Sequence, residues 1–336
     1  MLEKPAIADA RLSAVVQADF GIELEGVTFL PLGADVNTAV YRGAAVDGSM
    51  LFIKLRRGDD SGLSAQIPYA LAEQGIAEVI APIETTDGRL GAQLDDFQVI
   101  LTPYVNGIDG FGRALTDENW TILGRALRGI HETQLPAALR ARLPREDFSD
   151  EWRALVRVFQ SQAGSGDLPD AVAEQMAAIM RAQQPLVSEL LDHAQRFGDE
   201  LRGRTLAYVP CHADIHAGNV LMDERDRLYV VDWDTFMLAP KERDLMFIGA
   251  GIGDDWRGER PARLFYAGYG PAEVDQTLIA YYRCERIIQD FAAFGEYLQS
   301  AKGGADRAQA LHYFASNFDA GSTIDIALGA VEQARS

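Results

Sequence analysis

The sequence predicts an α+β fold of two lobes, a small N-terminal lobe built on an antiparallel sheet and a larger helical C-terminal lobe. Before residue 103, short apolar runs alternate with tight turns, as in an antiparallel meander. After residue 107, apolar residues recur at helical spacing. The break at Pro103–Gly107 suits a lobe boundary. We therefore expect lobes at residues 1–105 and 107–336, with a hinge at about 102–106.

The N-terminal lobe should begin with a helix at residues 6–19, for which Gly21 is the stop signal. Its strands are short apolar runs bounded by turn residues, and we expect them at residues 24–32, 39–41, 50–55, 80–83 and 97–102. A second helix, at residues 63–74, should end at Gly75.

The C-terminal lobe should be mostly helical. Thr116 can cap a helix whose apolar face carries Trp120, Leu123, Leu127 and Ile130. Further amphipathic or helical segments are expected at residues 152–159, 171–197, 241–248 and 271–331.

One stretch of this lobe carries the clearest chemistry. It runs from His212 to Asn219 in the pattern H-x-D-x-x-x-x-N. Phosphoryl transfer from ATP needs a carboxylate to orient and deprotonate a hydroxyl, and it needs an amide and a second carboxylate to hold magnesium. Asp214, Asn219 and Asp232 are those residue types in that order. The sequence therefore indicates a phosphotransferase.

The chain around these residues should form a hairpin. Residues 219–223 and 227–232 are apolar runs on either side of a polar turn. Folding back about Arg225 would bring Asn219 opposite Asp232, close enough for the two to share an ion. The alternative is a surface hairpin with polar residues at its ends.

Lys54 lies inside the apolar strand expected at residues 50–55. Lysine is rarely buried without a partner, and kinases hold such a lysine against the phosphates of the donor. An outward-facing position on the strand is the alternative. In protein kinases a glutamate on a following helix pairs with this lysine. The helix expected after Lys54 offers no obvious glutamate, so the acidic partner of Lys54 stays open. Arg56 and Arg57 are expected to be solvated.

Charge and composition limit the classes of molecule that the protein is expected to bind. The net charge of -19 and a pI of about 4.6 disfavour nucleic acid and anionic membranes, and they suit a cationic small molecule. Solubility alone would also explain the charge. No apolar run approaches the roughly 20 residues of a membrane span, the N-terminus does not resemble a signal peptide, and two cysteines form no CxxC motif. We expect a cytoplasmic protein, monomeric or weakly dimeric.

Two other motifs carry less weight. Gly249–Gly253 lacks the final glycine and the strand-turn-helix context of a dinucleotide fingerprint. His212 and His216 are four residues apart, as zinc ligands can be, but the sequence contains no H-E-x-x-H. We expect His212 to fix the loop by hydrogen bonds.

The segments His212–Leu221 and Val231–Ile248 resemble the aminoglycoside phosphotransferase family, whose fold is protein-kinase-like. The similarity is strongest to enzymes that act on spectinomycin, and it runs more weakly through most of the chain. The resemblance implies that Asp214 is the catalytic base and that Asn219 and Asp232 are magnesium ligands. It also implies that Lys54 contacts the α- and β-phosphates of ATP, with GTP not excluded.

The rest of the nucleotide site also follows from the resemblance. The phosphates would lie under the loop of Gly33 and Asp35, although this loop has one glycine rather than the three of protein kinases. Adenine would bind the hinge backbone at Pro103, Tyr104 and Val105. Asp244 would brace the catalytic loop.

The resemblance implies an aminoglycoside or aminocyclitol acceptor, spectinomycin first, and a role in antibiotic resistance. Protonated amines call for carboxylates or aromatic faces. The candidate acceptor residues are Asp234, His216, Trp256, Glu285, Asp290 and Glu296. Two alternatives stay open: a kinase of another hydroxylated metabolite, such as choline, a sugar or homoserine, and a nucleotide-binding module without catalysis.

Overall fold

The computed structural model describes most of the chain, namely residues 3–33, 35, 37–58, 62–165, 168–251, 254–299, 304–319 and 321–335. These residues form two compact units. The first comprises Met1–Pro144, His212–Met237 and Arg263–Gly270, and the second comprises Arg145–Cys211, Leu238–Ala262 and Pro271–Ser336. This division reflects which residues pack together and says nothing about movement. The hinge expected at 102–106 therefore stays a prediction.

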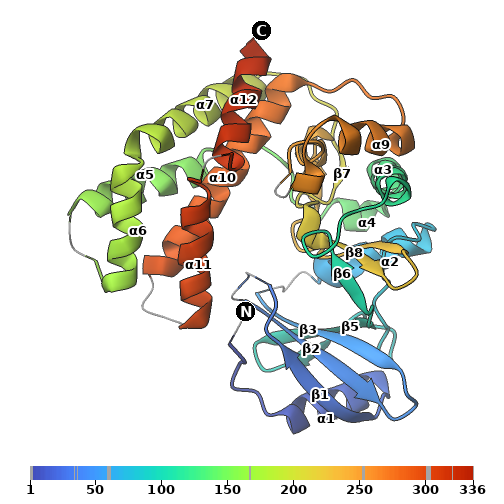
Figure 1. The fold of residues 1–336 in the computed structure, drawn as a ribbon. Coiled ribbons are helices and arrows are strands. Elements are labelled where there is room, and N and C mark those ends of the chain that lie inside the picture. Colours follow the sequence, from blue (N-terminus) through green and yellow to red (C-terminus); the bar gives the residue numbers. More distant parts are fainter. Residues whose placement is uncertain are drawn as a thin grey trace. The chain divides into compact units, whose positions relative to one another are not determined.

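The first unit is built on a five-stranded antiparallel sheet (Figure 1). Its strand order is β1-β2-β3-β5-β4. The strands are β1 (Leu24–Leu30), β2 (Thr38–Ala45), β3 (Met50–Arg57), β4 (Ala92–Leu94) and β5 (Phe97–Pro103). In this register Lys54 on β3 lies between Val40 on β2 and Ile100 on β5.

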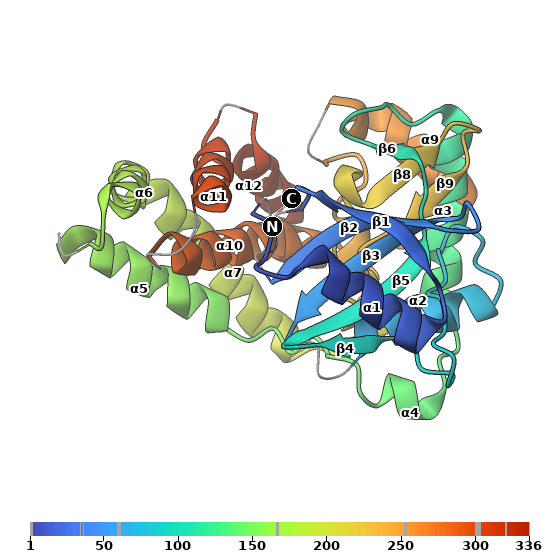
Figure 2. The ribbon, with the colours of Figure 1, turned by 90° about the horizontal axis from the view of Figure 1, so that it is seen from below.

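Helix α1 (Asp9–Phe20) covers one face of this sheet, packing against β1 and β4 (Figure 2). Gly21 ends the helix with a φ of 70°, a left-handed conformation that glycine adopts without strain. Burial alternates along β3, so that Leu51, Ile53 and Leu55 join the core under α1. Because side chains alternate between the faces of a strand, Lys54 and Arg56 share the opposite face.

The rest of the first unit includes a small sheet of order β6-β8-β9. Its strands are β6 (Gly107–Asp109), β8 (Val220–Asp223) and β9 (Leu228–Val230). The helices are α2 (Leu63–Glu73), α3 (Asp117–Glu132), α4 (Ala137–Arg140) and the part of α9 (Glu259–Tyr269) from Arg263 onward. Thr116 caps α3 as predicted, in a reciprocal capping box with Asn119.

The second unit is mainly helical, and α10 (Gln276–Gln299) lies at its centre (Figures 1 and 2). The helices that contact α10 include α5 (Glu151–Ser165), α6 (Ala171–Ala182), α7 (Gln184–Arg202), α11 (Ala305–Ser316) and α12 (Thr323–Arg335). The unit also holds α8 (Glu242–Leu245), a 3-10 turn (Asp254–Trp256), and β7 (Val209–Cys211), which pairs with β10 (Met237–Ala239).

Several predicted elements differ from the structure. The strand expected at residues 80–83 is wrong, because that segment is irregular and only the neighbouring Val79 makes an isolated bridge, to Val230. The amphipathic segment expected over 171–197 forms two helices that break at Gln183, just before Pro185. Strands β4 and β6 were not predicted, since three residues carry too short a pattern. Among the described residues, no helix is long and apolar enough to span a bilayer.

Candidate active site

The loop from His212 to Asn219 is tied to the segment that follows β9. The imidazole Nε2 of His212 lies 2.9 Å from the carbonyl of Val231, and its Nδ1 accepts the backbone N–H of Asp214 at 3.3 Å. Because Nδ1 accepts, Nε2 carries the proton and donates it to Val231. The ring also packs edge-on against Trp233, 4.8 Å between centroids. These bonds agree with the loop-fixing role expected of His212.

Asn219 holds Asp214 at the other end of the loop. Its amide nitrogen donates to the backbone carbonyl of Asp214 at 2.8 Å and lies 3.5 Å from the carboxylate Oδ2. The backbone carbonyl of Asn219 accepts the N–H of Val231 at 3.0 Å, and Val220 pairs with Val230. The predicted hairpin therefore forms, and it joins the two ends of the motif.

His216 lies beside the same carboxylate. Its Nδ1 accepts the N–H of Gly218 at 3.0 Å, and its Nε2 is 3.6 Å from Oδ2 of Asp214, outside hydrogen-bond range. The ring also packs against exposed Phe111, 5.9 Å between centroids. His216 is thus placed near the candidate base, where the sequence predicted a substrate contact.

Lys54 finds two acidic partners that sequence reasoning left open. Its ammonium nitrogen lies 2.6 Å from Oδ2 of Asp234 and 3.2 Å from Oδ1 of Asp232. The side chains of Lys54 and Asp234 are 16% and 12% exposed, whereas that of Asp232 is 51% exposed. Asp232 therefore keeps an open side, and Asp234 does not.

Arg56 is a site residue that sequence reasoning missed. Its Nη1 lies 2.5 Å from the same oxygen of Asp234 and 3.1 Å from Oδ2 of Asp35. The expectation that Arg56 is solvated is wrong, because its side chain is half-buried between these two carboxylates. Its spacing of two from Lys54 on one strand was the available signal.

Burial and ion pairing compete in this cluster. Burial acts to lower the pKa of Lys54, but Asp232 and Asp234 outweigh it, so the pKa lies above its usual value and the ammonium stays charged. Burial acts to raise the pKa of Asp232, but Lys54 holds it below its usual value. Burial, with neighbouring Asp232, raises the pKa of Asp234 in spite of Lys54 and Arg56. The cluster therefore favours the ionised form of Asp232 more than that of Asp234.

The donor set fits magnesium. The amide nitrogen of Asn219 is used on Asp214, which leaves its oxygen as the acceptor, and Asp232 offers a half-exposed carboxylate. Magnesium prefers such oxygen ligands and completes its shell with water and phosphate. The predicted ligand pair has suitable chemistry.

The predicted nucleotide contacts lie on the same unit. Gly33 has a φ of 84°, which favours glycine, and the carboxylate of Asp35 accepts the N–H of Asn37 at 2.8 Å. Ala34 and Val36 lie outside the described residues. At the expected hinge, Pro103 ends β5, Tyr104 donates its N–H to Met50 at 2.9 Å, and Val105 is half-buried.

Four predicted acceptor residues belong to the second unit, and their role stays a prediction. Trp256 is buried, and buried Glu285 forms an ion pair with Arg153, so neither offers an open face. Asp290 is half-buried and lies 3.2 Å from Arg286, whereas Glu296 is exposed.

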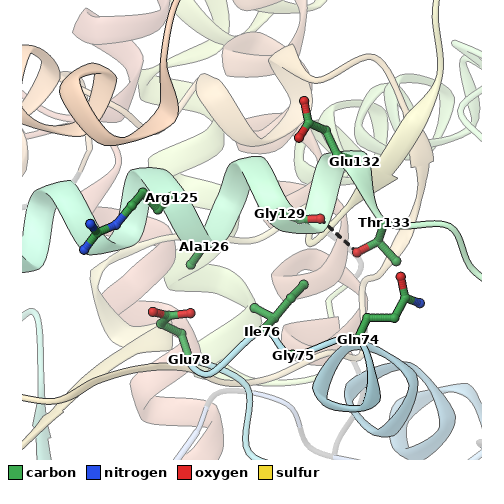
Figure 3. Close-up of a pocket in the computed structure, with 9 residues that line it drawn as sticks. All are labelled: Gln74, Gly75, Ile76, Glu78, Arg125, Ala126, Gly129, Glu132 and Thr133. Atoms are coloured by element: carbon green, nitrogen blue, oxygen red, sulfur yellow. Dashed lines mark hydrogen bonds between the residues drawn. The ribbon is translucent and has the colours of Figure 1, made fainter.

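A pocket of the first unit lies elsewhere, between the end of α2 and the helix α3 (Figure 3). It is lined by Gln74, Gly75, Ile76, Glu78, Arg125, Ala126, Gly129, Glu132 and Thr133. None of the predicted site residues lines it.

The fold and the placement of Lys54, Asp214, Asn219 and Asp232 suit a phosphotransferase. The sequence matches the phosphotransferase enzyme family, APH, over residues 55–284, about two thirds of the chain. The chain belongs to this family, as its sequence resemblance predicted.

Solved structures of a phosphotransferase are similar to this chain over nearly its whole length. The crystal structure of spectinomycin phosphotransferase, APH(9)-Ia, in complex with ADP and spectinomycin is 35% identical, with a TM-score of 0.89, covering 98% of this chain and 100% of that one. The AMP-bound complex of the same enzyme is 34% identical, with a TM-score of 0.85, covering 96% and 98%. Protein StrN of Streptomyces griseus is 29% identical over 231 residues, 66% of this chain and 69% of that protein. The predicted α+β, protein-kinase-like fold is confirmed.

Proposed function

We propose that this enzyme transfers the γ-phosphoryl group of ATP to a hydroxyl of spectinomycin and so confers resistance to that antibiotic. The observation that carries the proposal is the 35% identity, over 98% of the chain, to a spectinomycin phosphotransferase solved with ADP and spectinomycin. Lys54, Asp214, Asn219 and Asp232, the residues that we assign to phosphoryl transfer, belong to one unit. Since the donor is ATP, we place the enzyme in the cytoplasm.

Asp214 is the catalytic base of this proposal. Its carboxylate accepts the proton of the acceptor hydroxyl while the oxygen attacks the γ-phosphorus in line. The bonds from Asn219 and His212 fix its backbone before the acceptor arrives, so little ordering remains to be done.

The other groups serve the donor. Lys54 binds the α- and β-phosphates, the backbone at Gly33 and Asp35 covers them, and the backbone of Pro103, Tyr104 and Val105 holds adenine. Asn219 and Asp232 hold magnesium, which neutralises charge on the phosphates when bound. The amines of the acceptor meet carboxylates, for which Asp290 and Glu296 remain the accessible candidates.

An acceptor panel tests the proposal. Purified enzyme with magnesium and ATP is assayed against spectinomycin, a kanamycin-type aminoglycoside, choline, homoserine and a hexose, with mass spectrometry of the product. We expect spectinomycin to gain one phosphoryl group with a kcat/KM about a hundredfold or more above the others, since a mismatched polar acceptor leaves buried groups unpaired.

Preference for another acceptor would replace spectinomycin with that compound. No phosphorylation of any acceptor, together with stabilisation by magnesium and ATP, would favour a non-catalytic nucleotide-binding module.

A further inference from the structure

Lys54 and Arg56 act on one carboxylate from one strand. They lie two residues apart on β3, on the face turned away from α1. Both reach the same atom, Oδ2 of Asp234, at 2.6 Å and 2.5 Å. The other oxygen, Oδ1, is buried and has no hydrogen-bond partner among the described residues. Two cations therefore share a single oxygen.

Arg56 also reaches the loop expected to cover the phosphates. Its Nη1 lies 3.1 Å from Oδ2 of Asp35 and 3.4 Å from the hydroxyl of Thr38. Asp35 in turn accepts the N–H of Asn37 and, at 2.9 Å, the hydroxyl of Thr38. Arg56 thus joins this loop to Asp234, 178 residues further along the chain.

We propose that Arg56 is a positioning residue for the nucleotide, because it shares Asp234 with Lys54 and ties the Asp35 loop to the same carboxylate. This inference rests on the proposed function of the site as an ATP site. Sharing matters because a phosphate must draw Lys54 away from Asp232 and Asp234. A carboxylate that also has Arg56 as a partner holds Lys54 less tightly, so Lys54 is easier to transfer to phosphate.

The test compares Arg56→Met with Arg56→Lys. Loss of the cation leaves Lys54 as the only counter-ion of Asp234 among the described residues, and it removes the link between Asp234 and the loop of Asp35. The dissociation constant of ADP without magnesium and the KM of ATP should both rise about tenfold, as for losses of residues that orient a binding group. The KM of the acceptor should stay within about twofold. Arg56→Lys should restore most of the affinity, since all the described bonds of Arg56 come from Nη1 alone.

Arg57→Met is the matched control. Arg57 is the next residue on β3, 42% exposed, and pairs with Asp96 at 2.6 Å. The Arg57→Met variant should bind ADP with the affinity of the wild type. An equal loss in Arg57→Met, or an unchanged ADP dissociation constant in folded Arg56→Met, would overturn the inference. A purely structural role would reduce the active fraction and leave both KM values as they are.

A second variant guards against misfolding of Arg56→Met. Asp35→Asn keeps the oxygen that accepts from Asn37 and removes the charge that pairs with Arg56. It should weaken ADP binding, and the double variant should lose less than the sum of the two single losses. If the two losses in ADP affinity add up fully, or if Asp35→Asn binds ADP as the wild type does, the link between Arg56 and the Asp35 loop does not position the nucleotide.

The ADP measurement separates this inference from the proposed function. If no acceptor is phosphorylated but Arg56→Met still weakens ADP binding, the function fails and the inference stands. If spectinomycin is phosphorylated and Arg56→Met binds ADP normally, the proposed function stands and the inference about Arg56 fails.

Discussion

At the scale of single residues, the site is organised by side chains that bond to backbone. His212 accepts from Asp214 and donates to Val231, while Asn219 donates to the carbonyl of Asp214. Both ring nitrogens of His212 and the amide nitrogen of Asn219 thus hold the loop in place. Catalysis by preorganised groups depends on this kind of support.

Asp214→Asn tests the base directly. The amide keeps the size of the side chain but cannot accept the acceptor's proton, so kcat should fall about a hundred- to ten-thousandfold. The dissociation constant of ADP should change less than about twofold, because Asp214 acts on the acceptor. Isothermal titration and a coupled assay measure the two. Turnover within a few-fold of the wild type would exclude Asp214 as the base.

A buried carboxylate in the second unit makes stability depend on pH. Burial raises the pKa of Glu285 from its ordinary value of 4.5 to about 7, although Arg153 beside it acts in the opposite direction. The folded protein therefore holds this proton more tightly than the unfolded chain. The resulting stability is fully present below pH 4.5 and is lost as the pH rises to about 7, a change of roughly 3 kcal/mol.

Glu285→Gln should remove this component. The variant has a neutral side chain beside Arg153 at every pH, so its free energy of unfolding should fall less steeply than the wild type's between pH 5 and 7. Urea unfolding across that range measures both slopes. Parallel curves would show that Glu285 has an ordinary pKa in the folded protein.

At the scale of elements, two helices of the first unit meet at glycines. A Cβ on Gly124 of α3 would collide with the backbone carbonyl of Phe265 on α9, and one on Gly268 would collide with that of Thr121. Backbone cannot yield as a flexible side chain can, so the close approach of these helices depends on both glycines.

Gly124→Ala should therefore destabilise the protein by about 1–3 kcal/mol, as overpacking does. Gly129 lies on the same helix, and its Cβ would first meet Ile76 at 3.8 Å, an ordinary contact. Gly129→Ala should be neutral or stabilise by about 0.5–1 kcal/mol through helix propensity. Urea unfolding of both variants provides the comparison, and similar losses would mean that α3 does not approach α9 this closely.

At the scale of the whole molecule, charge favours a cationic acceptor. The chain carries 50 acidic and 31 basic residues. A negative field of this size raises the encounter rate with cations and is screened by salt.

The kcat/KM for spectinomycin, whose amines are protonated, should accordingly fall about three- to tenfold between 0.05 and 0.5 M sodium chloride. The kcat at saturating acceptor should be nearly constant and serves as the internal control. Steady-state assays at several ionic strengths provide the test. A kcat/KM that is flat or rises with salt would show that the net charge does not steer the acceptor.

The sequence by itself determined the four longer strands of the sheet, the capped helix after Thr116 and the order of Asp214, Asn219 and Asp232. Alternation, capping residues and motif spacing are local, so neighbours along the chain carry these signals. It did not determine short elements such as β4, or the break at Gln183 inside a continuous apolar pattern.

Only the tertiary structure decided the partners of Lys54 and the place of Arg56. The two aspartates beside Lys54 lie 178 and 180 residues away in the chain. The helix after Lys54, where kinases carry the acidic partner of this lysine, supplies neither of them. Which carboxylate meets a given cation depends on how the sheet and the hairpin of β8 and β9 pack, and no local pattern encodes that packing.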